Sequence, residues 1–214
     1  MERKYSSELF DSLNPEKKRK VLDGIIGELA ASGIDGCSVR TIANKIGISH
    51  GSLFHYFASK DAMVHFIIQE GVKVQREIME MSAPPDGDFF CGLENLFGSA
   101  LHYARTHREI ISIWMSLSQP GQARYARHTL EMEKEAIKAL KSQVRAARDS
   151  GAVSPEADID AAAYMIDSLL ANIIKSAVSE IEAMKFAEHF GPDDGNVIGR
   201  IMKMIRAFLA APGE

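Results

Sequence analysis

The sequence predicts an all-α protein of nine helices arranged in two domains. Nearly every long segment repeats apolar residues at helical spacing, and no run of five or six residues alternates β-branched side chains as a strand requires. Capping residues, prolines and glycines separate the segments. The 214 residues are 46% apolar and 25% charged, which is typical of a globular protein and unlike a disordered chain or a membrane protein.

Four helices are predicted in the first part of the chain. Asn14 precedes Pro15 at the start of the first, which ends at Gly33, and Ser38 caps the second, which ends at Gly47. Ser49 begins a third, very short helix, and a fourth ends before the break at Pro84–Gly87. The predicted ranges are 15–33, 38–47, 49–56 and 59–81.

Five further helices are predicted beyond this break, over residues 88–106, a short one over 108–117, and 120–151, 154–190 and 194–210. Together with the rest of the fourth helix they make up a second domain, residues 63–214, after a small first domain of residues 1–62. Residues 1–13 are expected to be a disordered tail, with a minor-groove arm through Arg3 and Lys4 as the alternative.

Charge and cysteine content restrict the function. The formal net charge is −4, but residues 1–62 carry nine Lys or Arg against eight Asp or Glu, so the first domain is the less acidic part. Cys37 and Cys91 are expected to be reduced core residues, and neither a metal nor a cofactor is predicted. The most apolar stretch, residues 161–178, contains Asp167 and Lys175 and is expected to span a bilayer poorly, so a cytoplasmic protein is expected.

The most informative stretch is residues 38–61, which has the form of a helix, a glycine turn at Gly47 and a second short helix. Leu53 and Phe57 are placed to hold the second helix down. Its outer face is small or polar, as is required of a helix that enters a major groove about 12 Å wide. The residues predicted to contact bases are Ser49, His50, Gly51, Ser52 and His55.

Groups suited to phosphate surround this helix. Ser38 and Arg40 lie in the first turn of one helix and Lys60 in the first turn of another, where backbone N–H groups already favour an anion. Tyr56 adds a hydroxyl at the edge of the groove. Such contacts position a protein on DNA without reading its sequence.

Residues 15–70 resemble the TetR family of bacterial transcriptional regulators. The resemblance lies in S-V-R-T-I-A-N-K-I-G-I-S, then G-S-L-F-H-Y-F, then S-K-D. The family usually has a phosphate-contacting tyrosine where this chain has Phe54, so Phe54 joins the phosphate set by position although its hydroxyl is missing.

The resemblance implies a homodimer in which the larger domain binds a small molecule and dimerises through its last two long helices. Ligand binding then tilts the fourth helix. Residues 161–181 are apolar on more than one face, which agrees with a partner on one side, although both helices could instead lie centrally in a monomeric bundle. The predicted interface residues are Ile166, Leu170, Ile173, Ala177, Ile201, Ile205 and Phe208, and a charge at Leu170 or Ile205 is expected to give monomers.

The effector is expected to be bulky and largely apolar. The candidate pocket residues, for which plain core packing is the alternative, are Phe97, Leu101, His102, Trp114, Met115, Tyr125 and Met165.

The sequence therefore predicts a ligand-responsive repressor that binds a palindromic operator as a dimer. The alternative is a helical protein–protein adaptor of the same fold without DNA binding. An enzyme is not expected, because the G-x-S-x-G match at residues 47–51 lacks the preceding strand that a hydrolase needs. Neither Glu-x-x-His pairs nor the metal-protease and phosphate-loop motifs occur.

Overall fold

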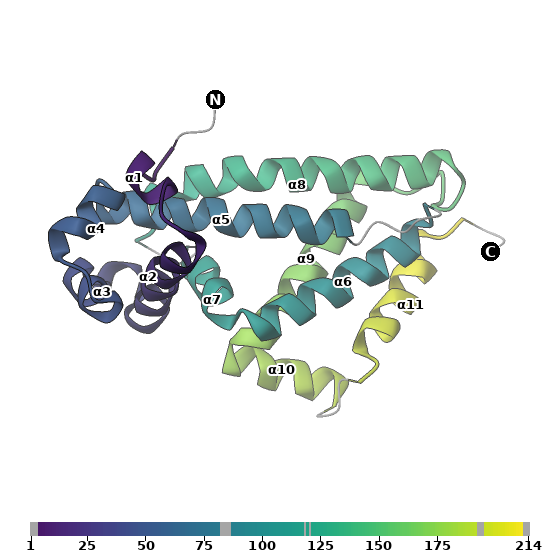
Figure 1. Ribbon diagram of the computed structural model, residues 1–214. Coiled ribbons are helices and arrows are strands. Elements are labelled where there is room, and N and C mark those ends of the chain that lie inside the picture. The colour runs from purple at the N-terminus through teal and green to yellow at the C-terminus, as the bar shows by residue number, and fades with distance from the viewer. Residues whose placement is uncertain (1–3, 82–86, 118, 120, 192–194, 212–214) are drawn as a thin grey trace. The chain divides into compact units, whose positions relative to one another are not determined.

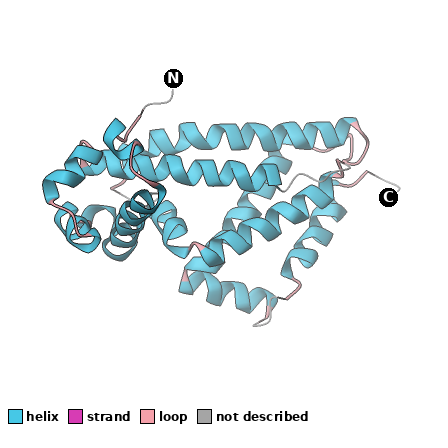
Figure 2. Ribbon diagram, viewed as in Figure 1, coloured by secondary structure: helices cyan, strands magenta, loops and turns pink. Residues whose placement is uncertain are grey.

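The computed structural model describes residues 4–81, 87–117, 119, 121–191 and 195–211. Within these residues the protein is all helical, as predicted, and contains no strand (Figure 2). Figure 1 labels the helices. They are α1 (Glu8–Asp11), α2 (Pro15–Gly36), α3 (Val39–Ile46), α4 (His50–Tyr56), α5 (Lys60–Met81), α6 (Phe89–Thr106), α7 (Arg108–Leu117), α8 (Ala123–Asp149), α9 (Ile159–Val178), α10 (Glu180–Phe190) and α11 (Val197–Leu209).

The described residues form eleven helices rather than the predicted nine. One addition is α1, a single turn capped by the Ser7 hydroxyl, which accepts from the Phe10 N–H. The other arises because the predicted helix 154–190 is interrupted at Ser179, whose extended backbone ends α9 and whose hydroxyl caps α10. Residue 120, where another predicted helix begins, lies outside the described residues.

The chain divides into two compact units, Met1–Lys73 with Glu109–Leu130 and Val74–Arg108 with Glu131–Glu214. The first unit thus continues past residue 62 and includes most of α7 and the start of α8. The periodicity of these helices does not reveal this association, because it depends on contacts between segments far apart in the chain. The functional boundary at residue 62 stays a prediction.

In the first unit, local sequence signals set the helix ends. Asn14 caps α2 through the Lys17 N–H, and Gly33 ends its regular part because its φ of 68° is left-handed. Gly47, with φ 75°, makes the turn after α3. Gly24 lets α2 and α3 approach closely, since a methyl group there would overlap the Ile46 side chain.

Residues 4–13 adopt a defined structure, so the expected disordered tail is wrong for these residues. Phe10 is only 2% exposed and packs against the rings of Tyr56, Phe57 and Phe66. The Ser7 N–H donates to the Tyr56 carbonyl over 2.9 Å. These contacts outweigh the entropy of ordering the segment. Arg3 lies outside the described residues, and Lys4 forms an ion pair with Asp11.

The second unit has its core where α6 packs against α9 and α11 (Figure 1). Phe97 and Ile166 are fully buried there, and Val153 forms an isolated bridge with Ala210 that ties the α8–α9 loop to the end of α11. Arg108 donates to the carbonyls of Ala177 and Val178 and so satisfies the C-terminal end of α9.

Helix α9 is long and apolar enough to cross a membrane by length and composition alone, contrary to the expectation from its two charged residues. A core helix of a globular protein has the same length and composition. In this structure one face of α9 is part of the core of the second unit, through residues that include Ala162, Ala163, Ile166 and Ile173.

Candidate nucleic-acid interface and effector site

Helix α4 packs against the interior of the first unit on one side and is exposed to solvent on the other. Leu53 and Phe57 are fully buried beneath it, as predicted. The Ser49 hydroxyl caps the helix by accepting from the Ser52 N–H over 3.0 Å. The opposite side is open to solvent: Ser52 is half-buried, whereas Ser49, His50, Gly51, Phe54 and His55 are exposed. The structure therefore leaves the predicted base-reading face uncovered.

The two serines of this face are coupled. The Ser49 and Ser52 hydroxyl oxygens lie 2.7 Å apart in a hydrogen bond. Ser49 therefore has a structural role in addition to the predicted base contact, and the two hydroxyls present one shared polar site.

His50 and Phe54 form the aromatic part of the same face. Their ring centroids lie 4.8 Å apart in an edge-on arrangement, and Phe54 is 40% exposed. A phenyl ring has no hydrogen to donate to a phosphate oxygen, so the phosphate contact assigned to Phe54 by position is corrected here. Its exposed surface instead suits an apolar group such as a thymine methyl.

The other predicted phosphate residues differ in their availability. Arg40 is exposed, whereas the Ser38 hydroxyl caps α3 by accepting from Thr41 N–H over 3.3 Å. The Lys60 ammonium donates to the Asp35 carbonyl over 2.9 Å, so part of its hydrogen-bonding capacity holds the α2–α3 loop. Tyr56 is half-buried, with its ring against Phe10.

Sequence reasoning missed Lys20. Its ammonium lies beside the turn between α3 and α4, because a methyl group built on Gly47 would be 3.8 Å from its Nζ. The signal was present as the basic run of residues 17–20, K-K-R-K, on α2. A cation at this turn is well placed for a phosphate of a duplex that α4 enters.

An ion pair joins α2 to α3 beneath this surface. The Glu28 carboxylate is 4% exposed and accepts from Lys45 over 2.7 Å and from Ser32 over 3.1 Å. The hydrogen bond from Lys45 lowers the pKa of Glu28 below its usual value. A carboxyl with a lowered folded-state pKa stabilises the fold above its unfolded pKa and loses that contribution as the pH falls through the folded value.

Glu28→Gln is therefore expected to lower the free energy of unfolding at pH 7 by about 1–3 kcal/mol, because a charge-assisted hydrogen bond in a buried position is lost. The difference from the unsubstituted protein is expected to shrink as the pH falls below about 4.5, where the unfolded carboxyl protonates. Urea unfolding at pH 7 and at pH 3.5 measures both effects. Asp23→Asn, at an exposed position of the same helix, is the control, and an equal loss for both variants would contradict the role of Glu28.

A second polar network, within the first unit, joins residues 122–125 to α2 and α5. Tyr125 is fully buried and its hydroxyl donates to the Asp61 carboxylate. Burial, together with this bond, raises the pKa of Tyr125 to about 12, so the hydroxyl stays a donor at physiological pH. Arg124 pairs with Asp35 over 2.9 Å, and Gln122 donates to the same carboxylate over 2.7 Å. Tyr125 thus holds the start of α5, and its predicted place in an effector pocket is corrected.

The remaining predicted pocket residues are divided between the two units. Trp114 and Met115 belong to the first unit, where the Trp114 indole fills the space beside Gly71. Phe97 is fully buried in the core of the second unit, Leu101 and Met165 pack against that core, and His102 is exposed.

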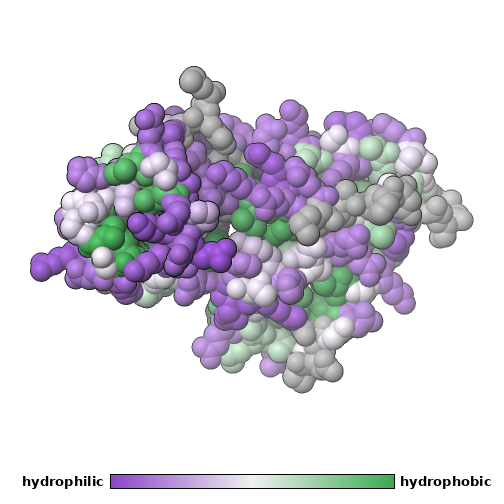
Figure 3. All heavy atoms as spheres, viewed as in Figure 1, coloured by the Kyte–Doolittle hydropathy of each residue, from purple (hydrophilic) through white to green (hydrophobic). Residues whose placement is uncertain are grey.

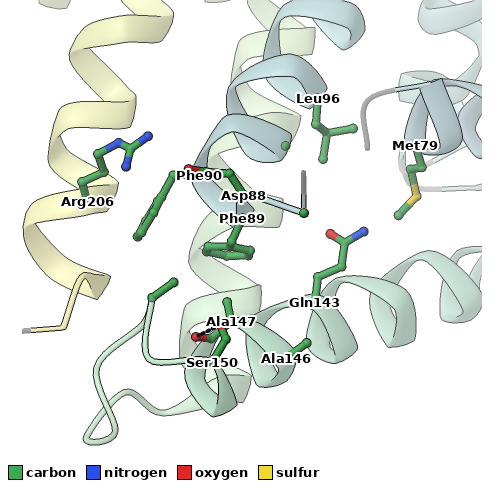
Figure 4. A pocket seen from close by; sticks show the side chains of 13 residues that line it. Met79, Asp88, Phe89, Phe90, Leu96, Gln143, Ala146, Ala147, Ser150 and Arg206 are labelled. Atoms are coloured by element: carbon green, nitrogen blue, oxygen red, sulfur yellow. Dashed lines mark hydrogen bonds between the residues drawn. The ribbon is translucent and has the colours of Figure 1, made fainter. Parts of the chain in front are cut away.

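A cavity of about 540 Å³ lies elsewhere in the second unit (Figure 4). Its lining comes from the end of α5, the start of α6 with the two residues before it, the end of α8 with residues of the loop after it, and one residue of α11. The residues are Met79, Gly87, Asp88, Phe89, Phe90, Gly92, Leu96, Gln143, Ala146, Ala147, Ser150, Ala152 and Arg206. None of the predicted pocket residues lines it.

Most of the predicted interface residues are buried within a single chain, so this prediction is wrong for them. Ile166, Ile173 and Ile205 are at most 1% exposed within one chain, so they have no surface left for a partner. Ile201 and Ala177 are buried as well, Leu170 packs partly against the core, and Phe208 alone is strongly exposed. A charge at Ile205 is thus expected to destabilise the core instead of separating subunits.

Other apolar side chains of the same helices are open to solvent. Tyr164 on α9 is 75% exposed, and Met204 and Phe208 on α11 are 57% and 69% exposed. Figure 3 shows hydrophobic side chains at the surface both near α11 and over the N-terminal helices, among mostly hydrophilic ones. We call Tyr164, Met204 and Phe208 the exposed apolar set.

Comparisons with known proteins agree with this geometry. Residues 21–66 match the family model described as bacterial regulatory proteins, tetR family. The chain is 26% identical over 100 residues to the HTH-type transcriptional regulator YvdT of Bacillus subtilis, covering 47% of this chain and 52% of that protein. It is 37% identical over 54 residues to an HTH-type transcriptional repressor of Mycobacterium tuberculosis, covering 25% and 29% of the two chains. The chain thus spans about half the length of the first relative and under a third of the second.

Solved structures match over nearly the whole chain. A TetR family regulator of Chloroflexus aurantiacus aligns with a TM-score of 0.68 and 21% identity, covering 96% of this chain and 99% of that one. The regulator FadR of Bacillus subtilis, solved with stearoyl-CoA, aligns with a TM-score of 0.74 and 15% identity, covering 89% and 98%. At these identities the similarity shows that the fold is shared.

Proposed function

We propose that this chain, whose residues 21–66 match the model of the tetR family of bacterial regulatory proteins, is a ligand-responsive repressor that binds a palindromic operator as a homodimer. Its relatives are named as HTH-type transcriptional regulators, and the proposed place of action is the cytoplasm, where bacterial DNA lies. The observation that carries the proposal is the uncovered face of α4 above fully buried Leu53 and Phe57. A seven-residue helix held in this way can present its exposed side chains to a major groove.

Two copies are needed because one short helix contacts too few base pairs to select an operator. In a dimer, two recognition helices about 34 Å apart read the two halves of a palindrome. The exposed apolar set supports a dimer through α9 and α11, since side chains of this size gain about 1.5–3 kcal/mol each when buried.

A bulky, largely apolar effector is supported by the similar fold of FadR, which was solved with stearoyl-CoA. A ligand that binds the DNA-free form more tightly releases the operator, and a coupling of about 1–3 kcal/mol is enough for regulation. The segment from Gln122 to Tyr125, itself part of the first unit, is the proposed route by which changes reach α2 and α5, because it bonds to Asp35 and Asp61 there.

Operator binding at several salt concentrations tests the proposal. Fragments recovered from genomic DNA by the purified protein supply the operator. If each subunit neutralises about three phosphates, a plot of the logarithm of the operator association constant against the logarithm of the salt concentration is expected to have a slope of about −5 for the dimer. A slope near zero, or no recovered fragment, would favour the protein–protein adaptor instead.

Arg40→Ala and His55→Ala are expected to have different effects. Loss of Arg40 removes a phosphate contact and weakens binding to all sequences by a similar factor, with a salt slope shallower by about 1. Loss of His55 changes the difference in binding free energy between bases at one operator position by about 1–3 kcal/mol, and so changes which base is preferred there. Competition binding against operators with single base changes measures both, and Lys138→Ala on α8 in the second unit is the control. A change of base preference in Arg40→Ala would reverse the assignment.

A further inference from the structure

The cavity in the second unit combines an apolar body with a cationic end. Phe89, Phe90, Leu96 and Met79 supply aromatic and aliphatic walls, and Ala147 faces the ring of Phe89 from α8 (Figure 4). A volume of about 540 Å³ falls in the range of sites for small organic molecules. The size and walls suit a ligand with a substantial apolar part.

Arg206 provides the charge. Its guanidinium lies over the ring of Phe90, 4.5 Å from the centroid, and Figure 4 shows the two side chains together at one end of the cavity. Within the part of the chain that the structure describes, no carboxylate lies within ion-pair distance of Arg206. Stacking on an aromatic face leaves the N–H edge of a guanidinium open, and this edge binds a carboxylate through two parallel hydrogen bonds.

The other charged residue of the lining is already engaged. The Asp88 carboxylate accepts from the Cys91 N–H over 2.7 Å and caps α6, so the dipole of that helix partly offsets its charge. Gln143 and Ser150 add neutral polar groups on the α8 side. Arg206 is therefore the group in the lining that selects the charge of a ligand.

We propose that this cavity binds an amphipathic monocarboxylate, with the apolar chain against Phe89 and Leu96 and the carboxylate on Arg206. The inference deepens the proposed function, on which its regulatory meaning rests, by assigning a site and a chemical class to the effector. The binding itself does not depend on DNA and is measured without it.

Titration calorimetry with decanoate, 1-decanol and decylammonium tests the inference, because the three probes share one alkyl chain and differ in the charge of the head group. Decanoate is expected to bind at least about 10-fold more tightly than decylammonium, since only the anion pairs with Arg206. Equal affinities for the three probes would overturn the proposal.

Two substitutions locate the binding. Arg206→Gln is expected to lower decanoate affinity about 10-fold and to leave decanol affinity unchanged. Ala146→Trp, at an exposed position in the lining, is expected to fill the cavity and weaken all three probes. Arg200→Gln is the matched control, because Arg200 stacks on Phe190 of α10, 5.0 Å from the ring centroid, and does not line the cavity. Equal effects of Arg200→Gln and Arg206→Gln would place the anion elsewhere and reject the site.

Failure of the inference and failure of the proposed function are distinguishable. If the protein binds operator DNA but Arg206→Gln leaves decanoate affinity unchanged, the site is rejected and the DNA-binding function stands. If decanoate binds as expected and operator binding shows no salt dependence, the site stands and the repressor proposal is rejected.

Discussion

Phe208→Glu is expected to convert the proposed dimer into monomers and to weaken operator binding by about 100-fold, because the second half-site is then no longer bound intramolecularly. Phe208 is 69% exposed in one chain, so the substitution leaves the core of the second unit intact. A carboxylate buried in an apolar interface without a partner opposes association strongly. Sedimentation velocity measures the oligomeric state, and operator titration measures the affinity.

Two further variants make the first result interpretable. Lys203→Glu introduces the same carboxylate at an exposed polar position of α11 and is expected to stay dimeric. Ile205→Glu is expected to lower thermal stability sharply, since Ile205 is 1% exposed. If Phe208→Glu sediments as the unsubstituted protein does, the exposed apolar set is not the interface.

Phe10→Ala is expected to lower the free energy of unfolding by about 3–5 kcal/mol, as removal of a buried phenylalanine side chain usually does. Phe10 packs on Tyr56, the last residue of α4, and on Phe57 directly after it. Operator affinity is therefore expected to fall as well, because the C-terminal end of α4 loses its support. Thermal unfolding and operator titration below the unfolding temperature measure the two effects.

Leu9→Ala is the control for Phe10→Ala, since Leu9 lies in the same short helix but is 53% exposed. It is expected to change stability by less than about 0.5 kcal/mol. Similar effects of both variants would mean that the N-terminal segment does not support α4.

The sequence predicts well those features that depend on neighbouring residues. Asn14, Ser38 and Ser49 cap helices where expected, because each side chain accepts from an N–H group only three residues away. Gly47 marks the turn because its left-handed backbone is a local requirement. The exposed face of α4 was predictable for the same reason, since it follows from helical periodicity alone.

Features that depend on distant contacts were not predictable in the same way. Helix α9 is apolar on more than one face, so periodicity could not decide that Ile166 points inward and Tyr164 outward. Tyr125 suits a pocket by its aromatic ring alone, whereas its partner Asp61 lies 64 residues earlier in the chain. The short helix around Phe10 carries too few residues to show a period.

Residues 109–130 complete the first compact unit, and this has a consequence for synthesis and for protein engineering. The chain must have emerged from the ribosome to about residue 130 before Gln122 and Tyr125 can form their hydrogen bonds with Asp35 and Asp61. A shortened chain that ends at residue 62 lacks these partners and leaves both carboxylates without the groups that bind them in the whole protein. Chimeric regulators in which the DNA-binding part is exchanged between relatives should therefore take residues 1–73 and residues 109–130 from the same parent.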